Sequence, residues 1–287
     1  MPVLVASDLD RTLIYSAAAL ALTMPDARAP RLLCVEVHES RPLSYMTETA
    51  AQLLTDLGDA AVFVPTTTRT RKQYQRISLP GPPPKYAICA NGGHLLVDGV
   101  SDPDWQAVVT ARLADECAPL AEVQAHLAAF ADPLWLRKER IAEELFAYLV
   151  VERELLPEEW VKELAVWAEN RGWTVSLQGR KIYAVPKPLT KGAAVREVAR
   201  RTGAELTLAA GDSLLDADLL LASTGLAPRP RRAARRGLDR TAGHGAARAR
   251  RAGGGADPAG VPEGRPREIG PDRAERPGVS RSSPRRN

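Results

Sequence analysis

The sequence predicts a doubly wound α/β core, built on a parallel sheet, with a second α/β domain inserted into it as a cap. Three short runs, 2–6, 62–64 and 206–210, are almost wholly apolar, which is typical of parallel strands buried on both faces. Helical patterns separate these runs along the chain, as parallel strands require. The long stretch between the second and third runs has helices and strands of its own, so we expect it to fold as the cap.

We expect the core to comprise residues 1–80 and 186–224, and the cap to comprise residues 81–185. In the core, a helix is predicted over 45–57 with Thr47 as its cap, and a short strand over 32–37. The expected cap helices are 105–117, 120–130 and 157–171, and the expected cap strands are 134–137, 145–151, 174–177 and 182–185.

Two carboxylates, one residue apart, follow the first apolar run in the segment Asp8-Leu9-Asp10-Arg11-Thr12. Ligands of open α/β sheets bind at the carboxyl ends of the strands, where this segment is expected to lie. One carboxylate could attack a substrate there while the other moves a proton.

Hydroxyl and basic residues occur at two later points of the expected core. Thr67 lies in a run of three threonines after the strand 62–64, and Arg69 follows it. Lys191 opens a helical stretch, where its charge is unfavourable for the helix dipole and therefore hints at a bound anion. Both segments suit the binding of a phosphoryl group.

A second acidic pair, Asp212 and Asp216, follows the strand 206–210 and a glycine. Each of these polar segments has an ordinary explanation when taken alone: an Asx turn, β-branched strand ends, a solvated lysine, a helix cap. Their occurrence in order, each at a strand or helix end, favours a single site instead.

Together the four segments resemble the haloacid dehalogenase (HAD) superfamily of phosphohydrolases. The resemblance covers residues 1–222 and implies a Rossmann-like core and a Mg²⁺-dependent reaction through an aspartyl-phosphate. It implies Asp8 as nucleophile and Asp10 as acid/base, Thr67 and Lys191 as phosphate-binding residues, Asp8, Asp10 and Asp212 as metal ligands, and Asp216 as a supporting acid. Arg11 departs from the pattern, because a glycine is usual at that position.

A strand followed by Asn91-Gly92 adds a resemblance to the branch with a large α/β cap, which includes sucrose-phosphatase and mannosyl-3-phosphoglycerate phosphatase. The implied substrate is a small phosphorylated metabolite such as a sugar phosphate, with Asn91, Arg140 and Arg180 as candidate substrate residues. Two alternatives stay open: a phosphomutase of the same superfamily, and a non-catalytic binding protein whose Arg-rich tail binds nucleic acid.

Three scattered cysteines and the absence of a basic, apolar leader favour a reduced, cytoplasmic protein, and no apolar stretch is long enough to span a membrane. The four histidines show no ligand spacing; His94 either faces the cleft or is an ordinary strand residue. The sequence does not predict an oligomeric state.

The last 63 residues, 225–287, contain sixteen Arg, six acids and no Lys, a net charge of +10, so residues 1–224 carry −6. The acidic part argues against nucleic-acid binding outside the tail. Gly, Ala, Pro and Arg make up 46 of the 63 residues. The segment therefore has too few large apolar side chains to form an ordered core. Because the core is expected to continue after Asp216, we interpret this change of composition either as a genuine disordered tail or as a shift of reading frame.

Overall fold

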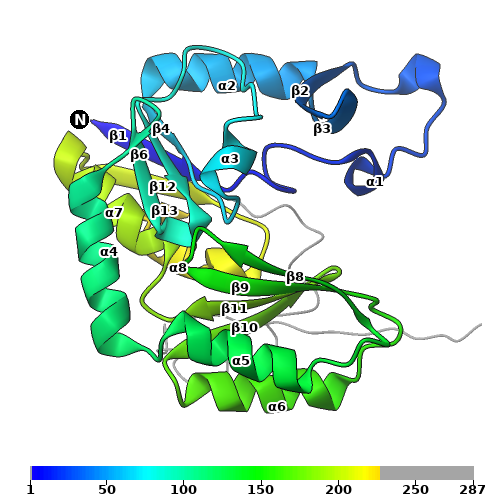
Figure 1. Cartoon of the computed structure of the whole chain (residues 1–287). Coiled ribbons are helices and arrows are strands. Elements are labelled where there is room, and N and C mark those ends of the chain that lie inside the picture. Colours follow the sequence, from blue (N-terminus) through cyan, green and yellow to red (C-terminus); the bar gives the residue numbers. More distant parts are fainter. Residues whose placement is uncertain (1, 227–287) are drawn as a thin grey trace, which may run out of the picture. The chain divides into compact units, whose positions relative to one another are not determined.

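A computed structural model describes residues 2–226, and a parallel sheet lies in the upper left of Figure 1. Its strand order is β13-β12-β1-β4, with β1 (Val3–Ser7) between β12 (Leu206–Ala210) and β4 (Val62–Pro65). Every pairing in it is parallel. The predicted α/β fold with a parallel core sheet is confirmed.

Buried apolar residues form the strands of this sheet. Leu4, Ala6 and Val64 are wholly buried, and Ala209 is almost so. The crossover helices are α2 (Glu48–Ala60), α7 (Lys191–Thr202) and α8 (Ala217–Leu221), with the short helices α1 (Ala17–Leu20), α3 (Arg71–Tyr74), η1 (Asp26–Arg28) and η3 (Leu214–Asp216) in the connections.

A hairpin of β2 (Leu32–His38) and β3 (Arg41–Thr47) lies between the first core strand and α2. The predicted helix over 45–57 begins too early, because Tyr45 pairs with Cys34 in this hairpin. Thr47 is the N-cap, as predicted, and its hydroxyl accepts a hydrogen bond from the backbone N–H of Ala50.

A second sheet, the cap sheet, is antiparallel and has the order β10-β11-β9-β8. Its strands are β8 (Leu136–Ala142), β9 (Phe146–Val151), β10 (Trp173–Gln178) and β11 (Lys181–Pro186). Helices α5 (Leu120–Phe130) and α6 (Glu158–Glu169) cover one of its faces (Figure 1). The predicted strand over 134–137 is too short, because β8 continues to Ala142 to pair with β9.

Three short strands, β5 (Tyr86–Cys89), β6 (His94–Val97) and β7 (Val100–Ser101), and helix α4 (Pro103–Glu116) lie between the two sheets in the sequence. A parallel bridge between Thr66 and Ile88 joins β5 to the end of β4. The short helix η2 (Ala90–Gly92) makes the turn between β5 and β6.

The strand β13 (Gly225–Leu226) pairs with β12 at the point where the composition of the chain changes. The rest of the predicted tail, 227–287, lies outside the described residues. Among residues 2–226, no helix combines the length and the apolar character needed to cross a membrane.

Candidate active site

The carboxyl ends of β1, β4 and β12 meet at one edge of the core sheet. Two backbone hydrogen bonds continue the strands past their ends, from the Asp8 N–H to the Ala210 carbonyl and from the Thr66 N–H to the Ser7 carbonyl. The predicted site segments that follow these three strands are therefore neighbours. The predicted helix start at Lys191 joins them from α7.

Lys191 lies between two carboxylates. Its Nζ is 2.6 Å from Oδ1 of Asp8 and 2.5 Å from Oδ1 of Asp216, and all three residues are buried. The sequence predicted a bound anion near Lys191. In the described structure, the negative charge beside it comes from the carboxylates of Asp8 and Asp216. Asp216, predicted only as a supporting acid, lies at the centre of the site.

The two carboxylates beside Lys191 differ in their other partners. Asp216 Oδ2 accepts hydrogen bonds from the N–H groups of Asp212 and Ser213 and from the Ser213 hydroxyl. Burial opposes ionisation of Asp216, but Lys191 and these donors hold its pKa below the ordinary value. Burial, with the charge of Asp216, raises the pKa of Asp8 to about 7 in spite of Lys191.

Three carboxylates form a compact oxygen cluster: Asp8, Asp212 and Asp216 each offer an oxygen, and these oxygens lie within 4.8 Å of one another. Such a hard-oxygen donor set fits Mg²⁺. Burial and the charge of Asp216 raise the pKa of Asp212. A bound divalent cation would lower this pKa again, because it stabilises the ionised carboxylate. The predicted metal ligand Asp10 is not in this cluster.

Asp10 points its carboxylate at Arg69 instead. Arg69 donates to it from Nε and Nη2, at 2.7 Å each, in a bidentate pair. Nη1 of the same guanidinium lies 2.8 Å from Oε2 of Glu36, which is 2 % exposed. Burial raises the pKa of Glu36, but hydrogen bonds from Ser44 and Arg69 outweigh it and lower the pKa. Sequence reasoning missed Glu36.

Arg11, the departure from the expected pattern, has φ 65, in the left-handed region where glycine is favoured. A non-glycine residue there costs about 1–2 kcal/mol. Its N–H donates to the Ile14 carbonyl in the turn after Asp10, and its charge opposes the raised pKa of Asp212. The chain therefore turns after Asp10 with an arginine in the left-handed region.

Thr67 is wholly buried, and its hydroxyl accepts a hydrogen bond from the Arg69 N–H. The backbone carbonyl of Thr67 accepts from the Asn91 N–H. Asn91 is buried too, and its Nδ2 donates to the Leu189 carbonyl, two residues before Lys191. Its Oδ1 has no hydrogen-bond partner among the described residues.

The candidate substrate residues Arg140 and Arg180 are exposed and have no contact with the carboxylate cluster in the described structure. Other residues of the cap sheet lie near the Asp10–Arg69 pair. Lys181 lies within electrostatic range of Asp10 and Arg69, and its ammonium stands 5.3 Å from the centroid of the Tyr148 ring. A lysine and a tyrosine on strands carry no motif, so the sequence did not single them out.

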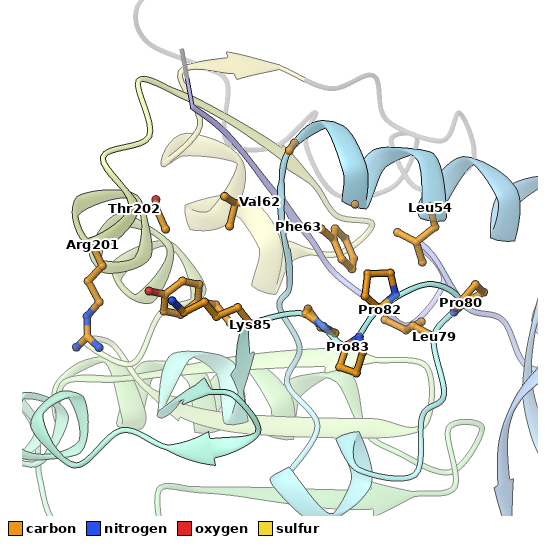
Figure 2. A pocket seen from close by; sticks show the side chains of 14 residues that line it. Leu54, Val62, Phe63, Leu79, Pro80, Pro82, Pro83, Lys85, Arg201 and Thr202 are labelled. Carbon is orange, nitrogen blue, oxygen red and sulfur yellow. The ribbon is translucent and has the colours of Figure 1, made fainter.

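A cavity of about 490 Å³ lies at the opposite edge of the core sheet (Figure 2). Val62 and Tyr86, which begin β4 and β5, line it with the prolines of the segment 80–84 and with Thr202 at the end of α7. It is therefore separate from the carboxylates, which follow the carboxyl ends of the strands.

The sequence matches no family model and no curated protein. The structure is similar to that of the sucrose-phosphatase from Synechocystis, at 16% identity and a TM-score of 0.49, over 77% of this chain and 80% of that one. It is also similar to the C-terminal domain of trehalose-6-phosphate phosphatase from C. albicans, at 16% identity and a TM-score of 0.44, over 77% and 73% of the two chains. A third similar structure is that of a HAD superfamily phosphatase from Bacteroides thetaiotaomicron, at 14% identity and a TM-score of 0.43, over 78% and 82%.

Proposed function

We propose that the protein is a Mg²⁺-dependent phosphomonoester hydrolase of the HAD superfamily that acts on a small polar metabolite such as a sugar phosphate. The observation that carries the proposal is the buried Lys191 between Asp8 and Asp216, with Asp212 beside them. The arrangement places one cationic and three carboxylate side chains at the carboxyl ends of the strands, where ligands of open α/β sheets bind.

Asp8 is the proposed nucleophile. One of its carboxylate oxygens attacks phosphorus, an Asp8 O–P bond forms, and the bond from phosphorus to the leaving oxygen breaks. Lys191 neutralises phosphoryl oxygens, and the Thr67 hydroxyl donates to them. Mg²⁺, held by Asp8 and Asp212 with Asp216 close by, would supply the positive charge that lets a dianionic phosphate approach Asp8.

Asp10 is the proposed acid/base. It gives a proton to the leaving oxygen in the first step and takes one from water in the second, which yields orthophosphate and restores Asp8. A carboxylate held at both oxygens by Arg69 is an acceptor only, so Arg69 must release Asp10 before it carries a proton. The anchor of Arg69 on Glu36 keeps the guanidinium close for the return.

The cap sheet is the proposed source of substrate selection. Tyr148 and Tyr183 are cross-strand partners with ring centroids 5.5 Å apart, and Arg140 pairs with Tyr148 on the next strand. Tyr183 lies within electrostatic range of Asp10, Lys191 and Arg69. Aromatic faces beside hydroxyl and cationic groups suit a sugar that carries a phosphate.

A phosphate-release screen over a panel of phosphorylated metabolites, with and without Mg²⁺, tests this proposal. We expect release from at least one ester, dependence on Mg²⁺, and loss of release in Asp8→Asn, whose amide cannot form the acyl phosphate. Absence of release from the whole panel, or undiminished release by the Asp8→Asn protein, contradicts the proposal. Product analysis separates hydrolysis from a mutase reaction, which would yield an isomer instead of orthophosphate.

A further inference from the structure

At the tip of the β8–β9 hairpin, the Glu143 carboxylate contacts the start of α3. Glu143 Oε1 accepts the backbone N–H of Arg71 at 2.7 Å, and Oε2 accepts from Nη2 and Nε of the same residue at 2.9 and 3.2 Å. The Glu143 side chain is 13% exposed. Arg71 holds the pKa of Glu143 below its ordinary value although burial opposes this, so the pair is charged.

The next residues of the hairpin reinforce this contact. Glu143 and Glu144 have φ 51 and 59 and are the central residues of the turn that the Leu145 N–H closes on the Ala142 carbonyl; the Glu143 carboxylate contacts the core, and Glu144 is exposed. Leu145 lies against Gly93, since a methyl group at Gly93 would come within 2.2 Å of the leucine Cδ1. A glutamate and a leucine therefore hold the tip from two sides.

A buried histidine faces the same carboxylate. His94 is 3% exposed, and its Nδ1 lies 2.6 Å from Nε2 of Gln106 and 2.7 Å from the Ser101 hydroxyl. A neutral His94 that accepts a hydrogen bond at Nδ1 would carry its proton on Nε2, which lies 3.7 Å from Oε2 of Glu143. Burial and Arg71 lower the pKa of His94, which favours this neutral form.

The residue that Glu143 binds, Arg71, is the first residue of α3 and directly follows the loop 66–70 of the candidate active site. Thr67 and Arg69 lie in this loop. Thr67 is the proposed hydrogen-bond donor to the phosphoryl group, and Arg69 binds Asp10. A cleft of about 580 Å³ lies beside Glu143 and Arg71. On that side, therefore, no packed side chains of the described residues would hold the hairpin if the ion pair were lost.

We propose that Glu143 is a positioning residue: through Arg71 it seats the β8–β9 hairpin on the core and fixes the loop that carries Thr67 and Arg69. It acts on the reaction without touching the substrate. The kinetic consequence rests on the proposed function, whereas the structural consequence does not.

Hydrogen exchange of the full chain without substrate tests the structural consequence. We expect Glu143→Ala to speed exchange about tenfold in peptides that cover 67–74 and 140–147, since the N–H of Arg71 loses its acceptor and the tip loses its anchor. Arg71→Met should have a similar effect at the tip, and adding it to Glu143→Ala should add little. Glu143→Gln, which retains an acceptor, should fall between the parent and Glu143→Ala.

Glu144→Ala is the matched control, because it changes the exposed neighbour in the same turn and should leave exchange at the parent rate. Unchanged exchange in Glu143→Ala, or an equal rise in the control, overturns the proposal. A rise that extends to the β1 peptide also overturns it, since the effect would then be general destabilisation.

The kinetic consequence is tested with glucose 6-phosphate and p-nitrophenyl phosphate. We expect Glu143→Ala to raise KM for the sugar phosphate several-fold more than KM for the aryl phosphate, which has less need of the cap sheet. A KM for the sugar phosphate that stays at the parent value contradicts the positioning role. If the parent releases no phosphate from any ester, the proposed function fails while the exchange experiment still decides the role of Glu143.

Discussion

Lys191 is wholly buried at the first position of α7, which is the least favourable end of a helix for a cation. Two carboxylates compensate the cost, and one of them, Asp216, receives three further hydrogen bonds. Among residues 2–226, the Asp8 carboxylate has as hydrogen-bond partners only Lys191 and, at 3.4 Å, the Thr12 hydroxyl. Asp8, the proposed nucleophile, is therefore the less stabilised of the two carboxylates, and a bound cation would stabilise it more than Asp216.

The raised pKa of Asp8 predicts how stability changes with pH when Mg²⁺ is absent. Between the ordinary value near 4 and about 7 the folded state binds the proton more tightly than the unfolded chain, so stability falls as pH rises. The loss is at most about 1.4 kcal/mol per pH unit. We expect Asp8→Asn to flatten this fall in melting temperatures measured with a chelator.

The exposed Asp59→Asn variant is the control and should behave as the parent does. Mg²⁺ should also flatten the curve in the parent, because it favours the carboxylate. A parent protein that becomes more stable from pH 5 to pH 7 under chelation contradicts the predicted environment of Asp8.

Asp10 is expected to matter in proportion to the need for a leaving-group proton. Asp10→Asn should lower kcat by about 10²-fold or more on an alkyl phosphate and far less on p-nitrophenyl phosphate, whose leaving group needs no proton. Steady-state rates on both esters check this. Equal losses on both would count against the acid role.

Sequence reasoning predicted the segments of the site but not all of their partners. Asp8, Thr67 and Asp212 follow parallel strands whose carboxyl ends lie at a single edge of the sheet, and Lys191, at the start of α7, contacts Asp8 there. Glu36 was missed, since irregular pairing within β2 buries Val35 and Glu36 side by side, against the alternation of a regular strand. Neither this bulge nor the contact between Glu36 and Arg69 can be read from local sequence.

At the scale of elements, the turn η2 supports the start of α7. Asn91 donates to the Leu189 carbonyl, and a Cβ at Gly92 would come within 2.2 Å of the Thr190 carbonyl oxygen. The Asn-Gly pair, which the sequence suggested as the opening of the cap, thus also packs against the segment that presents Lys191.

Gly92→Ala should therefore destabilise the fold by roughly 1–3 kcal/mol and lower activity through displacement of Lys191. The reason is twofold: φ is 99 at this position, and the added methyl group meets backbone. Urea unfolding measures the first effect. Gly58→Ala is the matched control, because a Cβ there meets nothing within 4 Å and the site lies inside α2; it should be neutral or stabilising.

A Gly92→Ala protein as stable as the parent would contradict the close packing of η2 on α7. An equal loss of stability in the Gly58→Ala control would show instead that any added side chain is harmful.

The lengths of the elements also limit sequence reasoning. The extent of β8 was underestimated because Lys138, Glu139 and Arg140, which show no apolar pattern, are held in the strand by pairing with β9.

At the scale of the whole molecule, β13 begins where the composition of the chain changes. Gly225 and Leu226 pair with Leu208 and Ala209 in parallel, which extends the core sheet by one more strand. The first two residues of the predicted tail thus form a strand of the core sheet. This agrees with the hypothesis that the reading frame shifts shortly after them.

Resequencing the source DNA across the codons for residues 223–232 tests this hypothesis. We expect a one- or two-base discrepancy, and a corrected frame that continues β13 with apolar residues before a closing amphipathic helix. Confirmation of the present frame would exclude a shift and favour the Arg-rich segment as a genuine tail.

The proposed reaction requires that Asp8 accept a phosphoryl group. Rapid acid quenching during turnover of p-nitrophenyl phosphate with Mg²⁺, followed by peptide mass analysis, detects that group. We expect one added phosphoryl group on the peptide that contains Asp8, absent with a chelator and in Asp8→Asn. Turnover with a persistent lack of phosphoryl mass on that peptide, or the same mass gain in Asp8→Asn, would contradict the proposed reaction.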